Sequence, residues 1–110
     1  MLWIQTDVST SALNRGDNAR LGNNMMLAAD PATGEVRRFL TGPRGCEITG
    51  VITTPDGRTM FVNIQHPGET PTERSDPARP TAVSAWPDGA GRPRSATIVI
   101  RKRDGGVIGS

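Results

Sequence analysis

Hydrophobic and polar residues alternate along short stretches of this chain, and clusters of turn residues separate those stretches. Alternation over about four to eight residues is typical of half-buried β-strands, whereas a helix repeats every 3.6 residues. The clearest case puts Met60, Val62 and Ile64 on one face and Phe61, Asn63 and Gln65 on the other. The pattern predicts strands at residues 2–6, 24–29, 35–40, 47–53, 59–65, 82–86 and 95–102. Only NMMLAA (24–29) has the propensity for a helical turn, and the turn that follows it favours a strand.

Proline and glycine mark the connections between these strands. DPATG (30–34) and TPDGR (54–58) have Pro near the start and Gly near the end, which favours tight turns. They predict two hairpins, over residues 24–40 and 47–65. Residues 67–80 contain four prolines, at 67, 71, 77 and 80, and predict an irregular loop. The tail, residues 105–110, is expected to be loose.

Short strands about ten residues apart predict an all-β fold of antiparallel four-stranded sheets, as in the blades of a β-propeller. A weak internal similarity fits this, because LWIQTD and FVNIQH each carry Ile-Gln after an aromatic residue, sixty positions apart. We expect a partial blade at about 1–42, a further blade at 43–104 and a tail at 105–110.

Composition excludes several function classes. The chain has 110 residues, enough for one small domain. Its hydrophobic content is 35%, and counting the 13 glycines as well brings this content to the range usual for globular domains. Its net charge of +2 comes from scattered basic residues, so nucleic-acid binding is disfavoured. The sequence has no run of 18 apolar residues, so it predicts no membrane-spanning helix. The single cysteine, Cys46, excludes an internal disulfide and is expected to be a small core residue.

Two pairs of residues could carry chemistry. His66 and Glu69 offer an imidazole and a carboxylate three positions apart, which makes them weak candidates for metal ligands; a polar turn is the simpler interpretation. Arg44 and Glu47, in GPRGCE, could bind a phosphate and a cation, or only form a local salt bridge.

The polar loop GDNARLGNN contains oxygen-bearing side chains that suit either calcium or turn formation, and turn formation is favoured. These residues are Asp17, Asn18, Asn23 and Asn24.

Several longer motifs resemble one family. LWIQTD, DPATGEVRRFL, TPDGRTMFVNIQHPGE and SATIVIRKRDGGVIG resemble the C-terminal end of the PhoX-type alkaline phosphatases, over nearly all of residues 2–109. The resemblance implies a hydrolase with a six-bladed β-propeller, which cleaves phosphate monoesters with calcium and iron. It also implies a periplasmic or secreted protein, although the first residues, MLWIQTDVST, have no signal-peptide pattern.

The resemblance implies limited roles for residues in this chain. Arg44 and Glu47 match one family motif and are the expected catalytic residues, with Arg44 facing the substrate phosphate. Most metal ligands of the family belong to segments upstream, and Cys46 is not equated with its iron-binding cysteine. We therefore expect a fragment, inactive alone, that self-associates through exposed strand edges. The alternative is a non-catalytic propeller segment that binds a ligand or partner.

Overall fold

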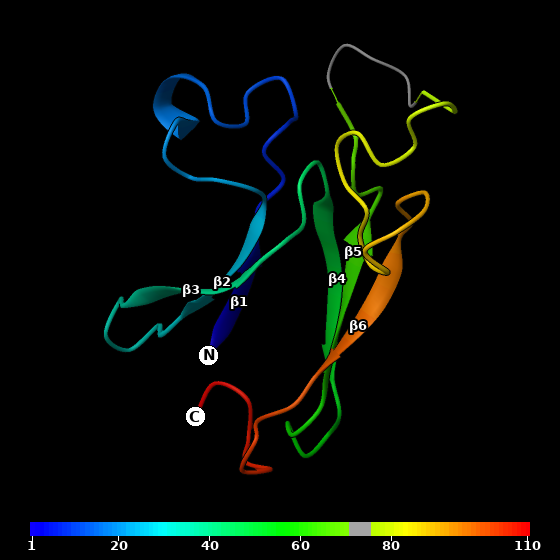
Figure 1. Ribbon diagram of the computed structural model, residues 1–110. Helices are drawn as coiled ribbons and strands as arrows, with labels where there is room; N and C mark the ends of the chain where they lie inside the picture. The colour runs from blue at the N-terminus through cyan, green and yellow to red at the C-terminus, as the bar shows by residue number, and fades with distance from the viewer. Residues whose placement is uncertain (71–75) are drawn as a thin grey trace.

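The strands of this protein form two antiparallel sheets of three strands each (Figure 1). The computed structural model describes residues 1–70 and 76–110. The first sheet has the order β1 (Leu2–Gln5), β2 (Met25–Ala29), β3 (Val36–Thr41), and the second β4 (Glu47–Thr53), β5 (Met60–Gln65), β6 (Ala96–Ile100). A single turn of 3-10 helix, η1 (Gly16–Asn18), interrupts the loop between β1 and β2. The all-β class and both hairpins are confirmed, but each sheet has three strands within the described residues, not four.

The strand expected at residues 82–86 is absent from the described structure, and that prediction is wrong. The segment is a loop between Pro80 and Pro87, in which the Trp86 amide donates a hydrogen bond to Ser84 Oγ at 3.2 Å. Both sides of β5 are already occupied, by β4 and β6. The largest apolar residue of the segment, Trp86, packs against the core instead of joining a sheet. Of the proline-rich loop predicted at 67–80, residues 71–75 lie outside the described residues, and the rest is irregular as expected.

A bulge at Gly50 sets the register of the β4–β5 hairpin. Near the turn Val51 pairs with Val62, but beyond Gly50 the partner of Thr49 is Asn63. Gly50 has a φ of +52°, a left-handed conformation that favours glycine. The one-residue shift keeps both Ile48 and Val51 against the core although their spacing is odd. It also pairs Glu47 with Gln65, so that His66 follows directly beside the start of β4.

The core lies between the two sheets. The predicted inward residues Met60, Val62 and Ile64 are at most 2% exposed, as expected from their alternation. They pack with Met26 of β2 and Cys46, so both sheets share one cluster. Burial of this apolar surface supplies most of the driving force for the fold.

The C-terminal tail is not loose. Ile108 is 8% exposed and belongs to the core cluster, and its amide donates a hydrogen bond to Gly57 O at 2.9 Å. Lys102 Nζ also donates to Ser110 O at 3.3 Å. An apolar residue in a glycine-rich tail gives no periodic pattern, so the burial of Ile108 could not be predicted from the sequence.

Within residues 1–70 and 76–110, no helix has the length and hydropathy needed to cross a membrane.

Candidate functional site

Two loops meet at the end of the second sheet opposite its hairpin turn. Residues 42–45 lead into β4, and residues 66–69 follow β5. Because β4 and β5 are antiparallel neighbours, the start of one lies beside the end of the other. The Gly68 amide donates to Arg44 O at 2.8 Å, and the Glu69 amide donates to Gly45 O at 3.1 Å. We call these two loops together with Glu47 the site end.

Gly45 allows the two loops to approach closely. Its φ is +69°, and a Cβ at this position would collide with the backbone of Glu69. A larger residue would therefore push the loops apart as well as strain the backbone. The sequence GPRG thus has a glycine where backbone contact between the loops requires one.

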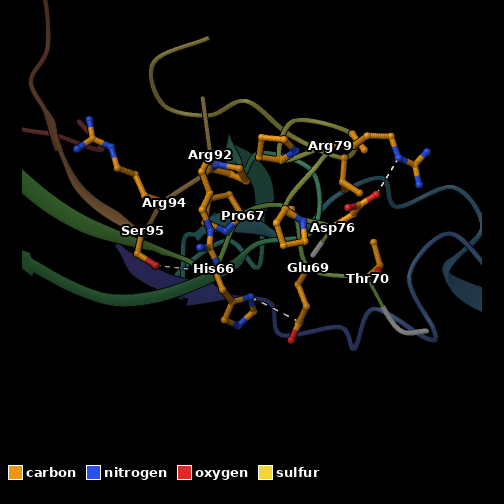
Figure 2. Close-up of a pocket in the computed structure, with 15 residues that line it drawn as sticks. His66, Pro67, Glu69, Thr70, Asp76, Arg79, Arg92, Arg94 and Ser95 are labelled. Carbon is orange, nitrogen blue, oxygen red and sulfur yellow. Dashed lines mark hydrogen bonds and ion pairs between the residues drawn. The ribbon is translucent and has the colours of Figure 1, made fainter. Parts of the chain in front are cut away.

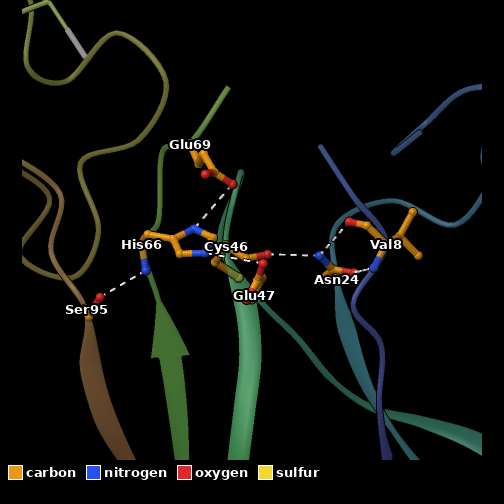
Figure 3. A network of polar contacts seen from close by, with 7 residues as sticks. All are labelled: Val8, Asn24, Cys46, Glu47, His66, Glu69 and Ser95. Atoms are coloured by element: carbon orange, nitrogen blue, oxygen red, sulfur yellow. Dashed lines mark hydrogen bonds and ion pairs between the residues drawn. The ribbon is translucent and has the colours of Figure 1, made fainter. Parts of the chain in front are cut away.

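The side chain of His66 lies between two carboxylates (Figure 3). Its Nε2 is 3.4 Å from Glu47 Oε1 and its Nδ1 is 3.5 Å from Glu69 Oε2. Both separations are ion-pair distances, and the buried Nδ1 has no hydrogen-bond partner among the described residues. The backbone of His66 has a φ of +34°, and its amide donates to Ser95 Oγ at 2.9 Å. A non-glycine residue in this left-handed region stores strain, which is common at functional sites.

The described residues do not fit a complete metal site. Among them, no group of three or more His, Cys, Asp or Glu side chains could hold a metal ion. The reason is visible around His66, because each of its nitrogens faces a different carboxylate rather than a shared position. His66 and Glu69 can therefore supply part of a ligand set, but a complete calcium or iron site would need donors from elsewhere.

Arg44 has an exposed side chain without a partner. Its guanidinium makes no hydrogen bond or ion pair with any residue in 1–70 and 76–110. The local salt bridge considered for Arg44 and Glu47 is not present, because Glu47 faces His66. Arg44 is therefore available for an anion in this loop.

Cys46 is part of the core, as expected. It is 2% exposed, and burial raises the pKa of its thiol to about 11. A thiol that stays protonated at neutral pH is a poor nucleophile. Its backbone carbonyl, in contrast, accepts a hydrogen bond from Asn24 beside the site.

Asn24 connects the two sheets beside the site, a role that sequence reasoning missed (Figure 3). Its Oδ1 accepts hydrogen bonds from Thr6 Oγ1 at 3.1 Å and from the Val8 amide at 2.8 Å. Its Nδ2 donates to Val8 O and to Cys46 O, both at 3.0 Å. The side chain is 2% exposed and makes all four bonds available to it. Asn24 thereby fixes the backbone of Cys46, the residue that precedes Glu47. The one feature of the sequence that could have indicated this role is the position of Asn24 directly before the apolar run of β2.

The other polar residues of this loop form turn-type contacts. Asn18 Nδ2 donates to Ala12 O at 3.4 Å, and Asn23 Nδ2 donates to Gly42 O at 3.2 Å. Asp17 lies in η1. These contacts agree with the interpretation of these residues as turn residues.

A pocket of about 760 Å³ lies beside the site end (Figure 2). His66 and Glu69 form part of its wall, together with segments 76–83 and 92–95. Arg79, Arg92 and Arg94 also line it. The arginines at 79, 92 and 94 and the pocket itself were not anticipated, because the pocket is formed by irregular segments between β5 and β6 that give no periodic pattern.

Comparison with known proteins gives two matches. The family alkaline phosphatase PhoX matches residues 1–68, which is more than half of the chain. A solved structure, Pseudomonas fluorescens PhoX in complex with vanadate, a transition state analogue, is 50% identical, with a TM-score of 0.72. The match covers 97% of this chain but 17% of that one. No curated protein matches the chain. The family match, together with 50% identity across nearly all its residues, shows that this chain belongs to the PhoX alkaline phosphatase family.

Proposed function

We propose that this chain forms one wall of the active site of a metal-dependent phosphatase that hydrolyses phosphate monoesters. The observation that carries the proposal is the guanidinium of Arg44, which has no partner among the described residues and lies beside the Glu47–His66–Glu69 group. Family membership supports it, and so does the 50% identity to a PhoX whose structure contains vanadate.

Arg44 would bind the equatorial oxygens of the phosphoryl group. A guanidinium pairs with such oxygens through two parallel hydrogen bonds and neutralises charge that develops in the transition state. The bond from the Gly68 amide to Arg44 O holds the backbone of this residue in place. Its exposed side chain has no partner among the described residues, so the side chain is the part that has to become ordered when the substrate binds.

Glu47 would orient His66 and present its second oxygen to a cation or a water molecule. An imidazole held by a carboxylate keeps a defined orientation, as general acid–base catalysis requires. Calcium and iron are the proposed cofactors of the complete enzyme, with most ligands outside this chain. His66 and Glu69 are the two groups here that could join such a set.

The chain spans about 17% of the length of its PhoX relative, so the complete site needs residues that these strands do not supply. We expect the two sheets to be parts of two blades of a six-bladed propeller, roughly residues 1–42 and 43–104, in a periplasmic or secreted enzyme. The chain alone would be inactive. It would also self-associate, because β1, β3, β4 and β6 are edge strands within the described sheets.

A hybrid enzyme tests the proposal. In it, this chain replaces the matching segment of the Pseudomonas fluorescens relative, and hydrolysis of 4-nitrophenyl phosphate is measured. The hybrid should be active, the isolated chain should not, and Glu47→Gln in the hybrid should lower kcat at least tenfold. Metal-dependent turnover by the isolated chain would overturn the expectation that it is one wall of a larger site. An active hybrid insensitive to Glu47→Gln and to changes at Arg44 would favour a non-catalytic binding segment instead.

A further inference from the structure

The pocket beside the site end has the size and position of a substrate subsite. Its volume of about 760 Å³ lies within the roughly 300–1,000 Å³ that small-molecule sites occupy. His66 and Glu69 belong to both the pocket wall and the candidate catalytic group. A molecule bound in the pocket would therefore lie next to the position proposed for the phosphoryl group.

Prolines and small aliphatic residues form the apolar part of the wall. They are Pro67, Pro77, Pro80 and Pro93, together with Ala82 and Val83. Proline rings have a fixed φ, so little conformational entropy is lost when a ligand packs against them. The loop that carries His66 packs tightly on this wall, because a Cβ on Gly68 would lie 3.1 Å from Pro93 Cγ.

Three arginines line the pocket, and two of them are paired with aspartates. Arg79 Nε is 3.0 Å from Asp76 Oδ2, and Arg94 Nη2 donates to both carboxylate oxygens of Asp88, at 3.0 and 2.7 Å. Figure 2 shows the Asp76–Arg79 pair on one side of the pocket and Arg94 on the other. Arg92 has no hydrogen bond or ion pair with any residue in the described ranges. Within residues 1–70 and 76–110, the guanidinium of Arg92 therefore has no counter-charge.

We propose that the pocket binds the leaving group of the substrate, and that Arg92 selects phosphate monoesters whose organic part carries a carboxylate or another anion. The apolar body of the leaving group would pack against the prolines, and its anion would pair with Arg92. The inference rests on the proposed phosphatase function and adds a substrate class to it. A charge-assisted hydrogen bond between a guanidinium and a carboxylate is about twice as strong as a neutral one, which makes it a useful selector.

The test compares two substrates in the hybrid enzyme, phenyl phosphate and 4-carboxyphenyl phosphate. Arg92→Ala should raise KM for 4-carboxyphenyl phosphate about tenfold and leave KM for phenyl phosphate and both kcat values unchanged. Arg92→Lys should restore part of the preference, because it keeps the charge. Arg103→Ala, which removes an exposed arginine outside the pocket, is the matched control and should leave KM and kcat unchanged for both substrates.

The outcomes separate the two proposals. An active hybrid in which Arg92→Ala affects both substrates equally, or neither, would overturn the role of Arg92 and leave the phosphatase function standing. A hybrid inactive toward both substrates would contradict the phosphatase function itself. In that case, NMR measurement of 4-hydroxybenzoate binding to the 110-residue chain tests whether the pocket binds an anion through Arg92. Weaker binding to the Arg92→Ala variant would support the anion site, and equal binding or no binding would refute it.

Discussion

At the turn end of the β4–β5 hairpin, residues 54–59 make most of their hydrogen bonds with one another, whereas the site end depends on residues distant in the sequence. The Thr54 amide donates to Thr59 O at 2.9 Å, and Asp56 Oδ1 accepts from the Thr54 hydroxyl and the Arg58 amide. At the site end, His66 meets Glu47 and Ser95, which are 19 and 29 positions away.

The difference between the two ends explains where strain and unpaired groups are found. The turn end has standard turn residues at the positions that need them. The site end has a left-handed histidine, a buried Nδ1 without a hydrogen bond and an arginine without a partner within the described residues. Local structure that is fully satisfied stabilises the fold, and groups left unsatisfied are available for ligands.

Matched glycine substitutions should give the largest contrast between the ends. Gly57 (φ +67°) and Gly45 (φ +69°) have nearly the same left-handed φ, so alanine at either should cost about 1–2 kcal/mol for this region. At Gly57 the new methyl meets only the flexible Val107 side chain, whereas at Gly45 it meets the Glu69 backbone. Overpacking there should add roughly 1–3 kcal/mol. Urea unfolding followed by tryptophan fluorescence measures both; equal losses would contradict the close loop contact.

Removing the amide of Asn24 should have the next largest effect. Asn24→Ala leaves the Val8 amide and Cys46 O without their partner, at a cost of about 1–3 kcal/mol. Asn23→Ala removes a single bond to Gly42 O and should cost less than about 1 kcal/mol. The same unfolding experiment applies. If the two variants were equally stable, Asn24 would not be the link between the sheets.

The buried thiol should make the stability of the chain depend on alkaline pH. Burial raises the pKa of Cys46 from its ordinary value of 9.0 to about 11. The unfolded chain therefore loses the proton first, and the contribution to stability is fully present below pH 9 and declines as the pH rises toward 11. The wild-type chain should lose stability over this interval relative to Cys46→Ala, as urea midpoints at successive pH values would reveal. Parallel pH profiles would contradict a buried thiol.

A charge removal at the turn end should have the smallest effect. Hydrogen bonds from the Thr54 side chain and the Arg58 amide hold the pKa of Asp56 below its ordinary value of 3.8. Its stabilisation is present above that value and is lost as the pH falls through the folded-state pKa. Asp56→Asn should thus lower the thermal midpoint slightly at pH 7, and the difference should vanish in strong acid. A constant difference at every pH would mean that the charge is irrelevant.

The comparison also shows what the sequence could and could not predict. The alternation of Met60, Val62 and Ile64 and the TPDGR turn are local signals, and the hairpin they predict is present. The bulge at Gly50 and the burial of Ile108 depend on tertiary packing, which leaves no periodic trace in the sequence.

The candidate site divides in the same way. Its residues Arg44, Glu47, His66 and Glu69 could be named from residue type and family resemblance. Their arrangement could not, because Glu47 meets His66 rather than Arg44 only through the register of β4 and β5. The role of Asn24 and the pocket around Arg92 need segments that only the fold brings together.

The most direct test of the central claim measures kcat/KM for 4-nitrophenyl phosphate in the hybrid enzyme, with one arginine removed at each end of the hairpin. Arg44→Ala should lower kcat/KM about 100- to 1,000-fold, as loss of a transition-state hydrogen-bond donor does. Arg58→Ala should leave it within about twofold, because Arg58 lies at the turn end, where its guanidinium donates to Gly105 O. Equal activity of the two variants would contradict the proposal that the site end forms a wall of the phosphatase active site.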